Sequence, residues 1–108
     1  MNILRWRGNT KKEGFVHVKV GKELLVGNRQ KLRNKILDLL DGGHLNIRLD
    51  MSECHLIDSS GLGVLHCLSQ EVDKRDGRLE IYHPTELVVA FLEQTRLGDD
   101  LTIIRSAA

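Results

Sequence analysis

Hydrophobic residues along the chain recur with two different spacings. Alternation with a period of two is typical of half-buried β-strands and predicts them over residues 3–7, 15–20, 45–50, 79–82 and 101–104. A polar turn over residues 8–14 joins the first two strands, so we expect them to pair as an antiparallel hairpin at one edge of a sheet. His17 and Lys19 are expected on the outer face of the second strand.

Between the later strands the hydrophobic residues return every three to four positions, which predicts three amphipathic helices. The first follows Asn28, a candidate N-cap, the second covers residues 60–76, and the third begins at Pro84. Each is expected to end at glycine: Gly42-Gly43, Gly77 and Gly98. The expected buried sides are Leu32, Ile36, Leu37, Leu39 and Leu40; then Leu62, Leu65, Leu68 and Val72; then Leu87, Val88, Phe91 and Leu92.

The predicted element order is β-β-α-β-α-β-α-β. Strands separated by helices imply right-handed crossovers, so we expect an α/β fold with a mixed, mostly parallel sheet, an N-terminal antiparallel edge hairpin, and helices packed on the sheet. The 108 residues match the usual size of one domain, and there is no internal repeat or linker, so residues 1–108 are predicted to be a single domain.

Composition narrows the classes of partner. The chain has 16 Lys and Arg against 15 Asp and Glu, a net charge of +1, which argues against direct nucleic-acid binding because phosphate backbones require clustered positive charge. No apolar run approaches the roughly 20 residues of a membrane span, and the N-terminus has no signal-peptide pattern. Two cysteines are too few for a disulfide framework. We therefore expect a cytoplasmic protein without membrane insertion.

The most informative segment covers residues 50–65, where a strand ends at Asp50 and a helix begins near Ser60. Asp58, Ser59 and Ser60 lie at that helix start, outside the carboxyl end of a strand, where open α/β sheets place their functional groups. One reading is purely structural, because Asp and Ser are good N-caps and the glycines at 61 and 63 would let the helix pack closely. One helix needs only one cap, however, so a functional reading stands beside it.

The functional reading concerns phosphorylation. A phosphate on a serine at this position would interact favourably with the helix dipole and free backbone N–H groups. It would also add roughly −1.5 to −2 charges next to Asp58. A partner that docks on this surface would then be repelled, while the fold itself tolerates the modification.

The segment resembles the signature of the STAS domain, the family named for sulfate transporters and bacterial anti-sigma factor antagonists. The family pattern is present here as Asp50, Ser52 and the sequence Asp-Ser-Ser-Gly-Leu-Gly at residues 58–63. The resemblance covers nearly the whole chain, because the predicted element order is also that of the family. It implies the STAS fold.

The resemblance further implies a non-enzymatic anti-sigma factor antagonist that acts by partner switching. The unphosphorylated protein would bind an anti-sigma factor that is also a serine kinase of the GHKL ATPase type, and thereby release a sigma factor. Phosphorylation of Ser59 would end this binding, and a PP2C-type phosphatase would reset the protein. Asp58 would help orient the hydroxyl, and Ser60, Gly61 and Leu62 would line the same partner-binding surface. No cofactor is implied, and a homodimer is left open.

Two features depart from the family pattern. Many members carry an aspartate before the first helix where this chain has Leu25. Many also have a C-terminal helix, which we do not expect after Ile104 in this sequence. These departures favour an alternative function within the same fold. The domain would then be a scaffold subunit of a sensory complex, or of a lipid or anion transporter, without sigma-factor control.

Two other kinds of chemistry have weak support in the sequence. Cys54-His55 and His66-Cys67 lack the spacing of metal ligands, and Cys67 is expected to be a small buried residue, so no metal site is predicted. A hydrolase would use Ser59 with Asp58 and either His55 or His83, but the nucleophile-elbow motif is missing.

Overall fold

The structure is a computed structural model that describes residues 14–96 and 101–105. Its helices and strands follow each other in the order β1 (Val16–Lys19), β2 (Glu23–Leu24), α1 (Arg29–Asp41), β3 (Asn46–Asp50), β4 (Leu56–Ile57), α2 (Ser59–Lys74), β5 (Arg78–Tyr82), α3 (Glu86–Thr95) and β6 (Thr102–Ile104).

A four-stranded sheet has the strand order β1-β3-β5-β6, and all of its strand pairs are parallel. This confirms the predicted α/β fold with a mostly parallel sheet. The predicted strand over residues 3–7, and with it the antiparallel hairpin, lies outside the described residues. A second, two-stranded sheet, in which β2 pairs in parallel with β4, was not predicted. Both of its strands have only two residues, too few to show a period.

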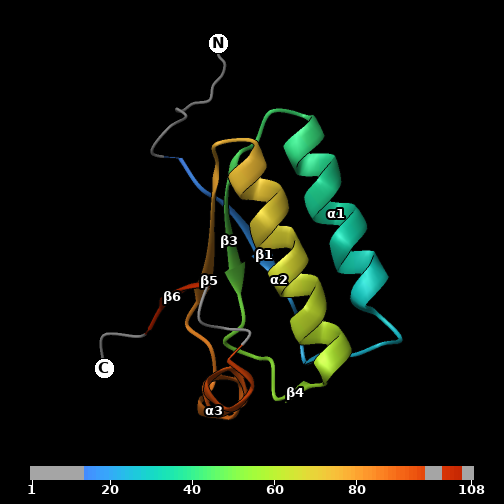
Figure 1. Cartoon of the computed structure of the whole chain (residues 1–108), viewed down its shortest axis with the longest axis vertical. Coiled ribbons are helices and arrows are strands. Elements are labelled where there is room, and N and C mark those ends of the chain that lie inside the picture. Colours follow the sequence, from blue (N-terminus) through green and yellow to red (C-terminus); the bar gives the residue numbers. More distant parts are fainter. Residues whose placement is uncertain (1–13, 97–100, 106–108) are drawn as a thin grey trace.

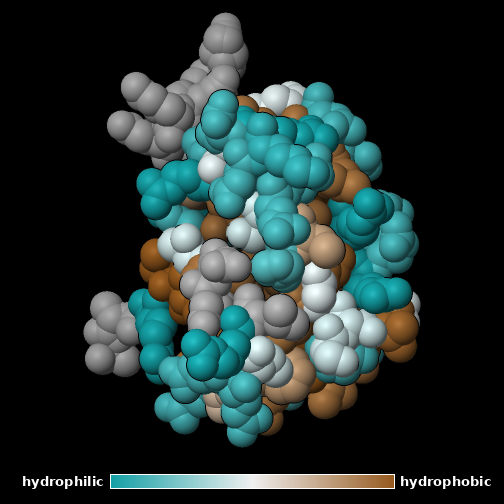
Figure 2. All heavy atoms as spheres, in the orientation of Figure 1, coloured by the Kyte–Doolittle hydropathy of each residue, from teal (hydrophilic) through white to brown (hydrophobic). Residues whose placement is uncertain are grey.

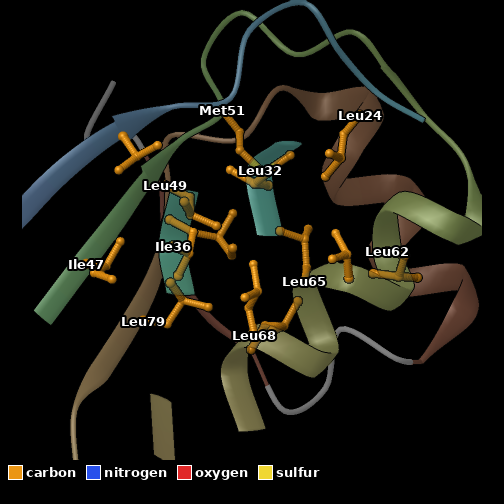
Figure 3. Close-up of a cluster of buried hydrophobic side chains, with 14 of the residues drawn as sticks. Leu24, Leu32, Ile36, Ile47, Leu49, Met51, Leu62, Leu65, Leu68 and Leu79 are labelled. Carbon is orange, nitrogen blue, oxygen red and sulfur yellow. The ribbon is translucent and has the colours of Figure 1, made fainter. Parts of the chain in front are cut away.

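Helices α1 and α2 lie side by side on one face of the four-stranded sheet, and α3 lies near β4 at one end of the molecule (Figure 1). The hydrophobic core fills the space between the sheet and these two helices. Figure 3 shows Ile47, Leu49 and Leu79 of the sheet facing Ile36 of α1 and Leu65 of α2. The predicted stripes of α1 and α2 are confirmed as buried or partly buried.

The opposite face of the strands carries polar and aromatic side chains. His17 and Lys19 are exposed there, as predicted. The Arg48 guanidinium forms a 2.7 Å ion pair with Glu80 and lies 4.1 Å from the centre of the Phe15 ring. Tyr82 contacts the same guanidinium at 5.1 Å. The two faces therefore differ in chemistry, because alternate residues of a strand point to opposite sides of the sheet.

The start of α1 differs from the expected cap. Asn28 occupies the N-cap position, but its side chain makes no capping bond. Instead, its Oδ1 accepts a 2.7 Å hydrogen bond from the Leu25 N–H, and its Nδ2 donates to the Glu23 carbonyl. Asn28 therefore shapes the β2–α1 turn. Asn side chains often bond to nearby backbone in turns, and this competes with capping.

The prediction that each helix ends at a glycine holds only in part. Gly43, at φ +93°, provides the left-handed residue after α1. After α2 that conformation belongs to Asp76, while Gly77 lies so close to the Leu45 carbonyl that a side chain would not fit. Helix α3 ends at Thr95, with Arg96 in the left-handed conformation. Gly98, predicted to end this helix, lies outside the described residues.

Two burial predictions are wrong. Cys67 is exposed, because it follows Leu65 by two residues and therefore points about 200° away from the buried stripe of α2. Leu87 of α3 is 54% exposed, and Val89 is buried in its place. Pro84 precedes the true cap Thr85, whose hydroxyl accepts from the Val88 N–H.

Candidate functional site

The chain leaves β3 through a short ordered loop. The Asp50 carboxylate accepts a 2.9 Å hydrogen bond from the Ser52 N–H, and this bond is the main cause that lowers the pKa of Asp50 below its ordinary value. The Cys54 side chain is buried, and the Cys54 carbonyl accepts a 2.7 Å hydrogen bond from the Thr85 hydroxyl at the start of α3. The loop is thus held both to its own strand and to α3.

The loop then returns to the core through β4. Ile57 is buried, whereas Leu56 is 52% exposed, since neighbouring strand residues point in opposite directions. The Leu24 carbonyl of β2 accepts a 3.4 Å hydrogen bond from the Asp58 N–H. Gly61 comes so close to Leu24 that an added Cβ would overlap its carbonyl oxygen. The first turn of α2 is therefore packed directly against β2.

Asp58 is the N-cap of α2. One carboxylate oxygen accepts a 2.8 Å hydrogen bond from the Gly61 N–H, and the other accepts a 3.1 Å bond from the Val26 N–H in the β2–α1 turn. The Gly61 bond is the largest cause that lowers the pKa of Asp58, and the positive charge of Arg29 contributes. The carboxylate is ionised at neutral pH, and it fastens the start of α2 to the neighbouring turn.

Ser59 is the first residue of α2 and is exposed to solvent. Ser60 is partly exposed. Leu62 is fully buried in the core and Gly61 is buried against β2, so neither provides a side chain to the surface. Their expected place on a partner-binding surface is corrected here: both residues bring α2 close to its neighbours. The structure thus brings Asp58, Ser59 and Ser60 together at the surface.

Exposed hydrophobic residues lie at the same end of the molecule. Val26 is 64% exposed, in the turn that bonds to Asp58, and Leu56 precedes Asp58 by two residues. Leu87 projects from α3, which packs against β4. Figure 2 shows hydrophobic atoms on the surface at the end where α2 begins. Val26 and Leu56 were not predicted as surface residues. They are apolar residues in segments too short to show a hydrophobic spacing, so no pattern in the sequence indicated that they are exposed.

This arrangement can present a hydroxyl for modification. Ser59 lies at the N-terminus of a 16-residue helix whose first turn contains no acidic side chain. That end carries a partial positive charge, which favours an added phosphate. Asp58 lies immediately before it and is a fixed negative charge. The Asp58 carboxylate bonds to backbone N–H groups, so it positions Ser59 by fixing the start of the helix.

The described part of the chain shows no assembled metal site or hydrolase site. Residues 14–96 and 101–105 contain no group of three potential metal ligands. His83 stacks on the Tyr82 ring with the two centres 4.0 Å apart. His55 is exposed. Gly63, expected to allow close packing, faces open space. Among the described helices none has the length and apolar character to cross a bilayer.

The α/β fold with its parallel sheet, and the helix that begins at an exposed serine beside a capping aspartate, are the features expected of a STAS domain. Residues 9–108 match the STAS domain family, and the chain belongs to this family.

Comparison with known proteins gives several relatives. The anti-sigma-B factor antagonist of Bacillus subtilis (strain 168) is 28% identical over 91 residues, which are 84% of this chain and 83% of that protein. A crystal structure of a candidate anti-sigma factor antagonist from Thermotoga maritima is 26% identical with a TM-score of 0.78, covering 86% of this chain and 80% of the other.

The fold is also that of the Bacillus protein SpoIIAA. Its unphosphorylated form has a TM-score of 0.68 at 19% identity, covering 86% of this chain and 81% of SpoIIAA. The phosphorylated form has a TM-score of 0.65 at 20% identity, covering 85% and 84%. At this identity the likeness concerns the fold.

Proposed function

We propose that this protein is an anti-sigma factor antagonist that works by partner switching in the cytoplasm. The unphosphorylated form binds an anti-sigma factor that is also a GHKL-type serine kinase, and the sigma factor is released. The kinase phosphorylates Ser59, the complex separates, and a PP2C-type phosphatase restores the binding form. The protein itself performs no catalysis in this cycle.

The observation that carries the proposal is the exposed Ser59 at the fixed N-terminus of α2. The names of the Bacillus subtilis and Thermotoga maritima relatives support the class of function. The exposed Val26 and Leu56 supply apolar area beside Ser59, of the kind that interface cores contain. Asp58, Ser60 and these two residues form the proposed partner-binding surface.

Phosphorylation would change this surface more than the fold. The phosphate would add roughly −1.5 to −2 charges beside the ionised Asp58 and next to exposed apolar area. A partner that covers Ser59 would have to desolvate that charge, which costs several kcal/mol and lowers affinity by orders of magnitude. The helix itself would retain its cap, because Asp58 keeps its bond to Gly61.

The test is intact-mass spectrometry after incubation with ATP and a purified GHKL-type kinase from the same genome. We expect one phosphate on the wild-type protein, none on Ser59→Ala, and one on the matched control Ser60→Ala. Phosphate on Ser59→Ala would contradict the assignment of the acceptor. Treatment with a PP2C-type phosphatase should return the phosphoprotein to its original mass.

Binding to the same kinase distinguishes the alternative function. We expect Ser59→Asp to weaken binding at least tenfold, while its melting temperature stays near that of the wild type. If no GHKL-type kinase of the genome binds the wild-type protein, and a membrane permease or a sensory assembly does, the scaffold function replaces sigma-factor control.

A further inference from the structure

A groove of about 310 Å³ lies between β1, β2 and α1. Its floor is formed by the apolar residues Val18, Val20, Leu24 and Leu32, which are buried or partly buried. Lys31, Lys35 and Asn28 border it, and so does Lys19 of the edge strand β1, whose side chain lies on the opposite face of the sheet. Apolar walls with a few charged groups are typical of small-molecule sites, and this volume is at the lower end of their range.

Two of the lysines that border the groove belong to α1. Lys31 and Lys35 are one helical turn apart and border the same groove. Neither forms an ion pair within the described residues, whereas Lys19 is paired with Glu53 at 3.4 Å. Like charges at this spacing disfavour a helix slightly. An anion in the groove would therefore reduce the repulsion between these two ammonium groups.

The charges of α1 add to this field. Its first seven residues include Arg29, Lys31, Arg33 and Lys35, with no acid in the first turn, while Asp38 and Asp41 lie near the other end. This is the reverse of the arrangement that stabilises a helix dipole. The dipole and the side chains together make the N-terminal half of α1 strongly positive. The arrangement costs helix stability, whereas a bound anion would be attracted by it.

We propose that this groove binds a small amphiphilic anion. Its carboxylate or phosphate head lies between the ammonium groups of Lys31 and Lys35, and its short acyl or aromatic body covers the apolar floor. A free anion alone would leave the floor unused, and a neutral apolar molecule would leave the lysines uncompensated. A phosphate-backbone ligand disagrees with the net charge of +1.

The groove is structurally connected to the Ser59 site through β2. Leu24 forms part of the groove floor, and its carbonyl accepts from the Asp58 N–H and contacts Gly61 at the start of α2. A ligand on Leu24 therefore touches the strand against which that helix start is packed. The binding site is separate from the proposed phosphorylation, so either can fail without the other.

The test is a titration of the full-length, isotope-labelled protein followed by amide resonances in NMR spectra. The probes are sodium octanoate, octyl phosphate, 1-octanol and inorganic phosphate. We expect octanoate and octyl phosphate to shift the amides of Val18, Leu24 and Leu32 in a saturable way. The dissociation constants of octanol and of inorganic phosphate should be at least fivefold higher.

Matched variants assign the charged part of the site. Lys31→Gln and Lys35→Gln should each weaken octanoate binding about fivefold. Arg33→Gln removes the same charge from the same helix but does not border the groove, so it should change binding less than twofold. An equal loss in Arg33→Gln would show general electrostatic attraction and overturn the site.

Other results also overturn the proposal. One is the lack of a saturable chemical-shift change with octanoate or octyl phosphate, and another is an equal affinity for inorganic phosphate. A third is a change in the amide resonances of the groove residues when only the protein concentration is raised. The last of these would show that a second copy of the chain occupies the groove. If octanoate shifts the Trp6 indole resonance, and this shift is the same in Lys31→Gln and Lys35→Gln, the N-terminal segment occupies the groove instead.

Discussion

The Asp58 carboxylate holds two separate segments at once. Its bond to Gly61 caps α2, and its bond to Val26 fixes the turn before α1. Both acceptors belong to one side chain, so a change at Asp58 affects the helix that carries Ser59 and the apolar turn beside it. The residue is therefore as much a structural element of the site as a part of its surface.

We expect Asp58→Ala to lower the melting temperature by about 4–8 °C, the usual effect of a lost N-cap in a domain of this size. Ser59→Ala serves as the matched control, because this exposed neighbour is not the cap, and it should stay within about 0.5 kcal/mol of the wild type. Thermal unfolding followed by circular dichroism measures both. Equal melting temperatures for Asp58→Ala and the wild type would contradict the capping role.

The pH dependence of this effect has a definite sign. Hydrogen bonds from Gly61 and Val26 lower the pKa of Asp58 below its ordinary value of 3.8. The stabilisation is therefore complete above that value and is lost as the pH falls through the lowered pKa. The difference in melting temperature between wild type and Asp58→Ala should be constant from pH 7 to 5 and should shrink towards pH 3. A difference that grows on acidification would contradict the assignment.

At the scale of elements, the close approach of α2 to β2 sets the position of the site. Gly61 faces the Leu24 carbonyl, and a Cβ at Gly61 would also lie 2.9 Å from the Leu24 Cγ. Any side chain would push the first turn of α2 away from β2. Gly63, two residues later, faces open space and does not limit this approach.

We expect Gly61→Ala to destabilise the protein by about 1–3 kcal/mol, as overpacking does. Gly63→Ala should stabilise it by about 0.5–1 kcal/mol, because alanine is the better helix former and meets no neighbour. Urea unfolding of the two variants measures both effects. Similar stabilities would show that the contact with β2 does not constrain α2.

At the scale of the whole molecule, the two faces of the sheet are stabilised differently. One face is covered by α1 and α2 (Figure 1). On the other face, side chains bridge neighbouring strands. Glu80 on β5 is only 4% exposed and depends on Arg48 of β3 for its ion pair, with Arg78 as a second, longer contact at 3.4 Å. The Phe15 ring covers the guanidinium from the β1 side.

We expect Arg48→Met to cost about 2–4 kcal/mol, since it leaves the buried Glu80 carboxylate without its main partner. The double variant Arg48→Met/Glu80→Gln should recover at least half of this loss, because the uncompensated charge is gone. Chemical denaturation of the single and double variants forms the cycle. A double variant no more stable than Arg48→Met would show that the lost contacts with Phe15 and Tyr82 dominate.

Much of this protein follows from its amino-acid sequence. The period-two and period-3.6 segments predicted the strands of the main sheet and all three helices, because one buried face per element imposes its own spacing on the hydrophobic residues. The sequence Asp-Ser-Ser-Gly-Leu-Gly identified the start of α2. It could not separate the exposed Ser59 from the buried Leu62, since which side of a first turn faces the core depends on the neighbouring β2.

Only the tertiary structure decided the contacts between segments distant in the chain. Two-residue strands such as β2 and β4 have no period, so their pairing exists only where the fold brings them together. The same holds for Asn28, whose side chain turns back to Leu25 and Glu23, and for the lysine-lined groove between β1 and α1. Spacing along the chain records which face of an element is buried, whereas its neighbours are set by packing in three dimensions.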